Sequence, residues 1–478
     1  MEVAVYCGQT WSWTGRRICD AYQGEKLNFN TVLKWLESRK GKESESFLIF
    51  GTDVVPYPVY NYPKRPIDAT PLFQFIKNGG TVIWAGDVPF YYLDRSGIRA
   101  ETFKSSNPFP FALVNLANAP YSTNAEPSIV GHMLGYSHRE SWRPVEPHPD
   151  LIPISYVEPL DRKSETPKLY SSWIYPYGKG RFVRVFDSPS IDPEFVLSLP
   201  RRLSELGHGV RIKNFRRFKD LKLVLPKETK VAVLLGDNDS GKTTVLEALA
   251  VLSREAEKVK EFRGELGAVN SEVEVFINGK YYYCRFSEDS KNCTSHLDGT
   301  LVYSKKEEFL TDAKGLSDYV ISEASRLFEV FHKDVMLVFL GPSNTVKVAL
   351  KDKTIIPATL LGSGYRSVLN FVLTHLVKKP RVLMIDDLEG FALHPELLKK
   401  FYDFLLKLDL DLVLITTQSS DVYAYLAERK LDQVKFVLLC GDDKYEIFRS
   451  EEVADMLYYE DLRYAALECG SRGSGEQS

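Results

Sequence analysis

A nine-residue stretch near the middle of the chain, GDNDSGKTT (236–244), carries residue types suited to phosphate binding. Its spacing is a glycine, four residues and then Gly-Lys-Thr, and the glycines let backbone N–H groups turn towards phosphate oxygens. An apolar run (231–235) precedes it and a helical pattern (245–262) follows, which is the context that distinguishes this motif from a chance glycine-rich turn. We expect Lys242 to reach the β- and γ-phosphates of a nucleotide and Thr243 to hold Mg²⁺. The residues expected to bind the nucleotide are Gly236, Asn238, Ser240, Gly241, Lys242, Thr243 and Thr244.

Acidic residues follow a second apolar run, in RVLMIDDLEG (381–390). Asp386 ends the run, where a carboxylate from a neighbouring strand would complete a Mg²⁺ site next to the loop. Asp387 comes next and is the expected general base that polarises the attacking water, with Glu389 as its rival. By itself an acidic turn is usually a solvated loop, so this interpretation depends on its pairing with the phosphate loop.

The pattern around these motifs predicts a domain of mixed sheet and helices over residues 208–468. Alternation in 210–225 predicts a pair of strands, and the run 412–416 predicts a buried strand. A helical stretch is expected over 303–332, followed by the loop GSGYRS (362–367) and a further helix. Residues 191–207 are expected to connect this domain to the first half of the chain, and residues 469–478 have the composition of a disordered tail.

The first half, residues 1–190, is predicted to be a separate α/β domain. Apolar runs at 3–7, 47–50 and 81–85 alternate with helical patterns at 30–41 and 70–80, which predicts a doubly wound parallel sheet. Residues 105–167 are expected to form long loops, followed by a strand over 180–187. Such sheets bind ligands beyond the carboxyl ends of their strands, where Thr10, Asp53 and Asp87 lie. These three residues are a candidate small-molecule or protein-contact site, and a purely structural role for their loops is an equal alternative.

Several segments of the second half occur in an order that resembles the soluble ABC-class ATPases of the RecF, SMC and OLD type. They are IKNFRRFKD (212–220), the phosphate loop, LGSGYRS (361–367), IDDLE (385–389), LHPE (393–396) and TTQSS (416–420). The resemblance implies an ABC-type P-loop domain that binds ATP and Mg²⁺. It implies that Ser363 and Gly364 cap the γ-phosphate of an opposite subunit in an ATP-dependent homodimer. It also implies that Asn214 and Arg217 border the adenine or ribose.

The chain departs from this family at residues that matter for hydrolysis. The expected base is Asp387 where the family usually has glutamate, and no glutamine lies between Gln74 and Gln418 to serve as the Q-loop residue. Gln418 occupies the position of the usual switch histidine, and an amide cannot shuttle a proton. We therefore expect slow ATP hydrolysis that suits a switch better than a motor. The alternatives are a non-hydrolysing nucleotide-dependent interaction module, or an enzyme whose active site lies in the first domain.

The segment FIKNGGTVIWAGDVPFYY (75–92) resembles the class I amidotransferase-like (ThuA-like) domains, over about residues 1–190. Amidotransferases place a cysteine nucleophile on a strained turn after this strand. Here Gly86 and Asp87 stand at that turn, so glutaminase chemistry is not expected. The first domain is then a sensor or scaffold that reads the state of the ATPase, and the resemblance of the second half suggests DNA maintenance or phage defence as its setting.

Composition limits the partners. The formal net charge is −3, so contact with DNA would need a local basic patch, and DNA or a protein partner both stay open. No apolar run approaches the ~20 residues of a membrane span, and the first residues lack a secretory signal pattern. The six cysteines form no C-x-x-C pair, which predicts reduced thiols. We therefore expect a cytoplasmic protein with no membrane partner.

Overall fold

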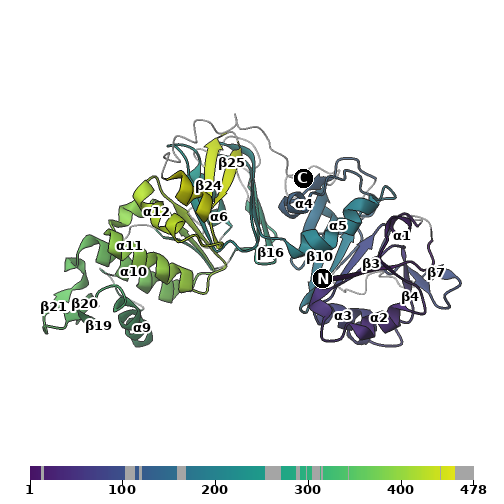
Figure 1. The fold of residues 1–478 in the computed structure, drawn as a ribbon, viewed down its shortest axis with the longest axis horizontal. Coiled ribbons are helices and arrows are strands. Elements are labelled where there is room, and N and C mark those ends of the chain that lie inside the picture. The colour runs from purple at the N-terminus through teal and green to yellow at the C-terminus, as the bar shows by residue number, and fades with distance from the viewer. Residues whose placement is uncertain are drawn as a thin grey trace. The chain divides into compact units, whose positions relative to one another are not determined.

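The computed structural model describes residues 1–11, 16–102, 114–117, 121–158, 168–252, 271–286, 291–297, 299–303, 310, 313, 316–342, 344–441 and 443–457. The chain divides into two compact units: the first contains Met1–Gly209 and the short segment Gly279–Tyr281, and the second contains Val210–Asn278 and the residues from Tyr282 onwards (Figure 1). The expected tail at 469–478 lies outside the described residues. Among the residues described, no helix has the length and apolar character needed to span a bilayer.

The first unit is built on an eight-stranded sheet in the order β2-β1-β3-β5-β11-β10-β9-β8. Neighbours from β2 to β11 run parallel, whereas β10, β9 and β8 continue the sheet with antiparallel pairing. Its strands are β1 (Glu2–Tyr6), β2 (Glu25–Leu27), β3 (Ser46–Phe50), β5 (Thr81–Ala85), β8 (Glu126–Pro127), β9 (Ile152–Val157), β10 (Leu169–Tyr177) and β11 (Gly180–Val185). A smaller sheet contains β4 (Val54–Pro56), β6 (Tyr92–Asp94) and β7 (Ala100–Thr102).

Helices cover both faces of the larger sheet. Helices α2 and α3 lie on one face, and α1, α4 and α5 lie on the other (Figure 1). Their bounds are α1 (Arg17–Ala21), α2 (Val32–Ser38), α3 (Pro71–Lys77), α4 (Ile129–Leu134) and α5 (Pro193–Ser204), with short 3-10 turns at Glu43–Glu45 and Ile67–Ala69. The central strands β3 and β5 are buried along their whole length, because a parallel strand covered on both faces has no polar side to present.

The expectation of long loops over 105–167 is wrong for part of that range. Helix α4 and strands β8 and β9 lie within it, and β9 is buried throughout. Its sequence, IPISYV, includes a proline and a serine, so it lacks the apolar run by which the parallel strands were recognised. Because Ser155 on β9 shares a hydrogen bond with Ser171 on β10 (2.5 Å between the Oγ atoms), polar residues are satisfied inside the sheet.

The second unit contains a six-stranded sheet in the order β18-β22-β23-β14-β24-β25. All neighbours from β18 to β24 are parallel, and β25 is antiparallel to β24. The strands are β14 (Val231–Leu235), β18 (Thr300–Tyr303), β22 (Val382–Ile385), β23 (Leu412–Thr416), β24 (Val434–Gly441) and β25 (Lys444–Arg449). A five-stranded sheet combines β12 (His208–Phe215), β13 (Phe218–Leu225), β15 (Ser271–Ile277), β16 (Lys280–Phe286) and β17 (Lys291–Cys293).

Two cores hold this unit together, one on each face of the six-stranded sheet. The sequence of strand β14 is apolar without alternation because both of its faces are buried. Val233 packs into the core that contains α9 to α12, whereas Ala232 and Leu234 pack into the core that contains α6 and the five-stranded sheet. The helices are α6 (Lys242–Val251), α9 (Asp318–Phe328), α10 (Ser363–Lys378), α11 (Pro395–Lys407), α12 (Ser420–Glu428) and α13 (Ser450–Met456), with 3-10 turns at Ala358–Leu360 and Leu388–Phe391.

Three details differ from the expected elements. Of the helical stretch expected over 303–332, the structure describes β18 at its start and α9 towards its end. Residues 335–357 form an antiparallel sheet of β19 (Val335–Leu340), β20 (Val346–Leu350) and β21 (Ile355–Pro357), which the sequence pattern did not reveal. The expected loop GSGYRS is already helical from Ser363 onwards, because Gly362 is the N-cap of α10.

The expectation of reduced thiols is wrong for four of the six cysteines. Cys7 is bonded to Cys19, and Cys284 is bonded to Cys293. Cys7 directly follows β1, and α1 brings Cys19 back towards that end of the strand. Cys284 and Cys293 are direct partners across the antiparallel pair β16–β17. The spacing of these cysteines in the sequence does not predict either disulfide, because the two cysteines of each pair come close only after the chain has folded back on itself.

Candidate functional site

The phosphate loop joins β14 to α6, as its sequence context required. Gly236 and Gly241 both have left-handed backbone angles, with φ of 137° and 103°, which favour glycine. Residue 241 must also be glycine for a steric reason, since a Cβ there would lie 2.4 Å from Cζ of Phe218. The loop is therefore held against β13 in a shape that leaves its backbone open to a ligand.

Lys242 and Ser240 supply polar groups to this loop. The Lys242 Nζ donates hydrogen bonds to the carbonyl oxygens of Gly236 (2.8 Å) and Asp237 (2.9 Å). Burial lowers the pKa of Lys242, while nearby carboxylates, Asp237 first among them, act to raise it. Ser240 is buried, and its Oγ finds no hydrogen-bond partner within the described chain. An ammonium and an unpaired buried hydroxyl at a glycine loop fit a phosphate group.

Thr243 and Asp386 come together although 143 residues separate them in the sequence. The Thr243 Oγ1 lies 3.2 Å from Oδ1 and 3.3 Å from Oδ2 of Asp386. Strand β23 lies between β14 and β22, and its last residue, Thr416, donates a hydrogen bond from Oγ1 to Asp386 Oδ1 (2.6 Å). Thr416 also accepts a hydrogen bond from the Asp387 N–H (2.8 Å). A hydroxyl and a carboxylate held at this distance are suited to share a hard cation such as Mg²⁺.

The three expected catalytic residues have different surroundings. Asp387 is exposed and has a left-handed backbone, with φ of 57°, which is uncommon for a residue other than glycine. Both Glu389 oxygens accept hydrogen bonds, one from Thr417 Oγ1 (2.7 Å) and the other from the Gln418 N–H (2.9 Å). Burial acts to raise the pKa of Glu389, but these hydrogen bonds, together with one that involves the Asp387 side chain, outweigh it and the pKa is lowered. Glu389 therefore holds the 417–418 segment, and Asp387 is the more exposed of the two carboxylates.

A cavity of about 480 Å³ opens beside the loop. Gln418 lines it and donates a hydrogen bond from Nε2 to Asn238 Oδ1 (2.7 Å), so the expected switch residue and the loop are in contact. Arg217 also lines the cavity, as expected, whereas Asn214 does not belong to the lining. Asn214 shapes the adjoining turn, where its carbonyl oxygen accepts a hydrogen bond from Ser271. The cavity lining also includes Arg216, Asp239, Gly241, Lys242, Thr243 and Thr244.

Sequence reasoning missed two classes of residue at this site. Thr416 and Thr417 hold Asp386 and Glu389; the segment TTQSS (416–420) was quoted for the resemblance, but no role was given to its two threonines. Arg216 lines the cavity and forms an ion pair with Glu247 (2.5 Å). The sequence places two arginines side by side at 216 and 217, but only Arg217 was predicted to border the nucleotide.

Ser363 and Gly364 do not join the nucleotide cavity of their own chain. They lie at the N-terminus of α10 and line a second cavity of about 340 Å³ together with His394 and Lys400. Ser363 is exposed, while Gly364 is buried and a Cβ there would lie 2.9 Å from the Ala392 carbonyl oxygen. Glycine at residue 364 therefore allows the helix N-terminus to pack closely against the segment that follows Asp387.

In the first unit, the structure brings Thr10 and Asp53 together. Asp53 Oδ1 accepts hydrogen bonds from Thr10 Oγ1 (3.2 Å) and the Trp11 N–H (2.7 Å). They lie beyond β1 and β3, where the strand order reverses, which is the usual ligand position in such sheets. Asp87 is nearly buried and pairs with Arg143 (3.4 Å to Nε); burial raises the pKa of Asp87. These contacts show that Asp53 and Asp87 hold loops, and a ligand site at Thr10, Asp53 and Asp87 stays a prediction.

Sequence profiles match the two units separately. Residues 208–313 match the AAA ATPase domain (AAA_15), and residues 17–200 match the MJECL34 family. The uncharacterized protein MJECL34 of Methanocaldococcus jannaschii is 26% identical over 229 residues, which cover 45% of this chain and 75% of that protein. The expectation of an ATPase domain in the second half is confirmed by the first match, which supports ATP binding. The amidotransferase-like resemblance of residues 1–190 stays a prediction.

The solved structures that match part of this chain include SMC heads and RecF, each at low identity and with a TM-score below 0.5. The SMC head domain from Thermotoga maritima is 13% identical with a TM-score of 0.37, covering 51% of this chain and 98% of that chain. The Smc head domain with an extended coiled coil, bound to the C-terminal domain of ScpA from Pyrococcus furiosus, is 12% identical with a TM-score of 0.38, covering 52% and 98%. The recombination mediator RecF is 13% identical with a TM-score of 0.34, covering 49% and 96%.

Proposed function

We propose that the protein is an ATP-dependent switch whose second unit is an ABC-type ATPase head of the RecF, SMC and OLD type. The observation that carries this proposal is the contact of Thr243 with Asp386, with Thr416 orienting the carboxylate. A bound Mg²⁺ would neutralise phosphate charge and polarise the phosphoryl group. Thr243 and Asp386 are the residues that would hold it, and the phosphate loop with Lys242 would bind the ATP phosphates.

Hydrolysis in this proposal depends on Asp387 and is slow. Asp387 orients the attacking water and accepts its proton, since Glu389 is engaged with Thr417 and Gln418. An aspartate side chain is one methylene shorter than the usual glutamate, and Gln418 cannot relay a proton. Both features favour a long-lived ATP-bound state over rapid turnover. The engaged Glu389 also favours the alternative function, a module that binds ATP without hydrolysing it.

ATP binding in this proposal closes a homodimer. Ser363 and the start of α10 would cap the γ-phosphate bound by the other copy, because the helix N-terminus offers N–H groups and a hydroxyl to an anion. Supporting this, Ser363 is exposed and lies in a cavity apart from the phosphate loop of its own chain. The first unit, an amidotransferase-like sensor or scaffold without a cysteine nucleophile, would transmit the closed state to DNA or a protein partner in DNA maintenance or defence, in the cytoplasm.

Phosphate release by the purified full chain tests the enzymatic part. We expect slow release that Lys242→Ala and Asp387→Asn both abolish, with ATP binding lost in the first variant and kept in the second. Binding without any release would favour the non-hydrolysing module. An activity that survives Lys242→Ala but is lost in Asp53→Ala or Asp87→Ala would instead place the active site in the first unit.

Molecular mass in solution tests the dimer. Light scattering with and without a slowly hydrolysed ATP analogue should show a monomer becoming a dimer, and Ser363→Arg should prevent the change without affecting ATP binding. A monomer under both conditions would refute the sandwich while leaving ATP binding intact. Stimulation of phosphate release by DNA, measured at two salt concentrations, tests the nucleic-acid partner.

A further inference from the structure

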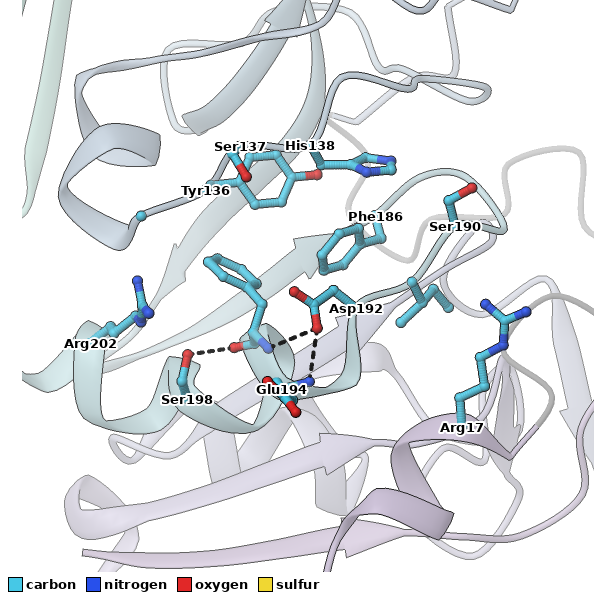
Figure 2. Close-up of a pocket in the computed structure, with 13 residues that line it drawn as sticks. Arg17, Tyr136, Ser137, His138, Phe186, Ser190, Asp192, Glu194, Ser198 and Arg202 are labelled. Carbon is cyan, nitrogen blue, oxygen red and sulfur yellow. Dashed lines mark hydrogen bonds between the residues drawn. The ribbon is translucent and has the colours of Figure 1, made fainter. Parts of the chain in front are cut away.

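A cavity of about 730 Å³ lies in the first unit, between the segment after α4, the segment after β11, helix α5 and the start of α1 (Figure 2). Arg202 lines it and donates a hydrogen bond to the Leu134 carbonyl oxygen (2.5 Å). Phe186 and Phe195 are buried against each other, with ring centres 5.8 Å apart. The aromatic rings of this cavity are therefore used in packing, whereas a surface of the second unit exposes its apolar side chains.

That surface is the outer face of the sheet formed by β19, β20 and β21 (Figure 1). The inner face packs into the core of the unit, where the paired residues Val338 and Val348 are fully buried. Side chains alternate along a strand, so the neighbouring residues face the other way. Two cross-strand rows form this outer face: Leu337, Ala349 and Ile355, and Phe339, Lys347 and Pro357. All of them except Lys347 are apolar.

Much of the outer face is exposed to solvent. Leu337 is 45% exposed and Ile355 is 57% exposed, and Met336, at the irregularity in β19, is 61% exposed. These three side chains lie outside the hydrophobic core of the second unit. An antiparallel sheet that meets water on one face usually presents polar residues there. The apolar residues on this face therefore indicate contact with another molecule.

The charges near this face are mainly positive. Four lysines lie in or beside its strands: Lys333, Lys347, Lys351 and Lys353. In the described part of the chain, none of their ammonium groups has an ion-pair or hydrogen-bond partner. Of the two aspartates nearby, Asp352 is engaged in the turn after β20, where it accepts a hydrogen bond from the Thr354 N–H (2.8 Å), and the other is Asp334.

This charge distinguishes between possible occupants. In a twofold contact between two copies the same patch faces itself, so the lysines of one copy would approach those of the other. Like charges brought together across an interface are unfavourable, whereas carboxylates of a partner would be attracted. The face is therefore complementary to an acidic partner rather than to a second copy of this chain.

The dimensions of the face suit an α-helix. Three strands about 4.8 Å apart form a face roughly 10–15 Å wide, and an α-helix with its side chains is about 10–12 Å across. Strands β19 and β20 have 6 and 5 residues. At ~3.3 Å per residue they are about 15–20 Å long, which matches a helix of about three to four turns.

We propose that the outer face of the β19–β21 sheet binds an acidic amphipathic helix of a partner protein. The apolar stripe of that helix packs on Leu337, Phe339 and Ile355, and a carboxylate beside the stripe pairs with Lys347. Carboxylates at the edge of the helix pair with the lysines of the β20–β21 turn. The surface is separate from the ATP site, because none of these residues lines the nucleotide cavity. The proposal does not depend on the ATP-dependent switch.

Three synthetic peptides of about 14 residues, roughly four helical turns, test the proposal. They share leucines at helical spacing and differ only at the polar positions, which are glutamate, glutamine or lysine. Fluorescence anisotropy with the full-length protein should show the glutamate peptide binding at least about tenfold more tightly than the glutamine peptide, and the lysine peptide binding most weakly. Added salt should reduce the difference. Equal affinities, or no binding of the glutamate peptide, would overturn the proposal.

Substitutions on the face provide a second test. Lys347→Glu should reverse the order of the peptides, so that the lysine peptide binds best. Leu337→Ser and Ile355→Ser should each weaken binding of the glutamate peptide about three- to tenfold, because they remove exposed apolar contact area. Val377→Ser and Lys378→Glu, exposed on α10 and outside the sheet, are the matched controls and should leave binding unchanged. Equal effects of face and control variants would refute the assignment.

Other occupants would give different results. A dimer that forms without nucleotide and that Ile355→Ser disrupts, seen by light scattering, would make this face a contact between copies and overturn the proposal. Sedimentation with phosphatidylserine vesicles that Ile355→Ser abolishes, without binding of the glutamate peptide, would make it a membrane-binding surface. Peptide binding should persist in Lys242→Ala, so failure of ATP binding and failure of this proposal are distinguishable.

Discussion

Replacing Thr416 with valine tests the central geometry of the ATPase site. The substitution keeps the shape of a buried side chain but removes the hydroxyl that donates to Asp386 (2.6 Å) and accepts from the Asp387 N–H (2.8 Å). A hydrogen bond to a charged group contributes about 1.5–3 kcal/mol, and each ~1.4 kcal/mol is a factor of ten in rate. If that contact orients Asp386 in the transition state, kcat should fall about 10- to 100-fold. ATP affinity should change little, because the phosphate loop and Lys242 are untouched.

The adjacent residue supplies the control for this experiment. Thr417→Val removes a hydroxyl of equal burial, but that hydroxyl contacts Glu389 instead of Asp386. We expect a smaller loss of kcat, below about threefold, because Glu389 positions a segment and does not contact the attacking water. Phosphate release and binding of a fluorescent ATP analogue should be measured for both variants. An unchanged kcat in Thr416→Val, or equal losses in both, would refute the reasoning.

Three further predictions follow from particular contacts. Asp387→Asn should lower phosphate release about 100-fold or more while Glu389→Gln lowers it far less, and the reverse order would make Glu389 the base. Gly241→Ala should abolish ATP binding and destabilise the second unit by about 1–3 kcal/mol, measured by urea unfolding, because of the positive φ and the collision with Phe218. Burial raises the pKa of Asp187 from 3.8 to about 6, so between these pH values the folded chain keeps a proton that the unfolded chain has lost. The first unit should therefore lose stability as pH rises through this window, and Asp187→Asn should remove that dependence. Tryptophan fluorescence can report it selectively, since all six tryptophans (Trp11, Trp13, Trp35, Trp84, Trp142 and Trp173) lie in the first unit; an identical pH profile in the variant would contradict the assignment.

Elements buried on both faces could be predicted from sequence. Strands β3, β5, β14, β22 and β23 each contain an uninterrupted apolar run of at least four residues, because parallel strands under helices contact apolar layers on either side. Strand β9 and the sheet of β19 to β21 escaped detection. Strand β9 has a mixed composition and so has no such run, whereas β19 (VMLVFL) is an apolar run that was not recognised as a strand; the pairing of both depends on partners elsewhere in the chain.

The candidate site shows the same division. Local spacing was enough to single out Lys242, Thr243 and Asp386, since the loop must supply N–H groups, a cation and a hydroxyl within a few residues. The assignment of Glu389 to Thr417 and Gln418, with Asp387 left exposed, required the relative positions of β22 and β23. The cavity around Arg202 had no local signal at all, because four separate segments build its walls.

The sequence by itself determined that the chain carries an ATPase domain that follows a separate α/β domain. A phosphate loop and a buried strand each consist of consecutive residues, so both can be recognised without knowing the fold. Only the tertiary structure decided which carboxylate is more exposed, that Cys7 is bonded to Cys19, and that Arg202 lies beside Phe195. The physical reason is that the folded chain turns back on itself. Hydrogen bonds, ion pairs and cavities form between residues that are close in space, and packing brings such residues together regardless of their separation in sequence.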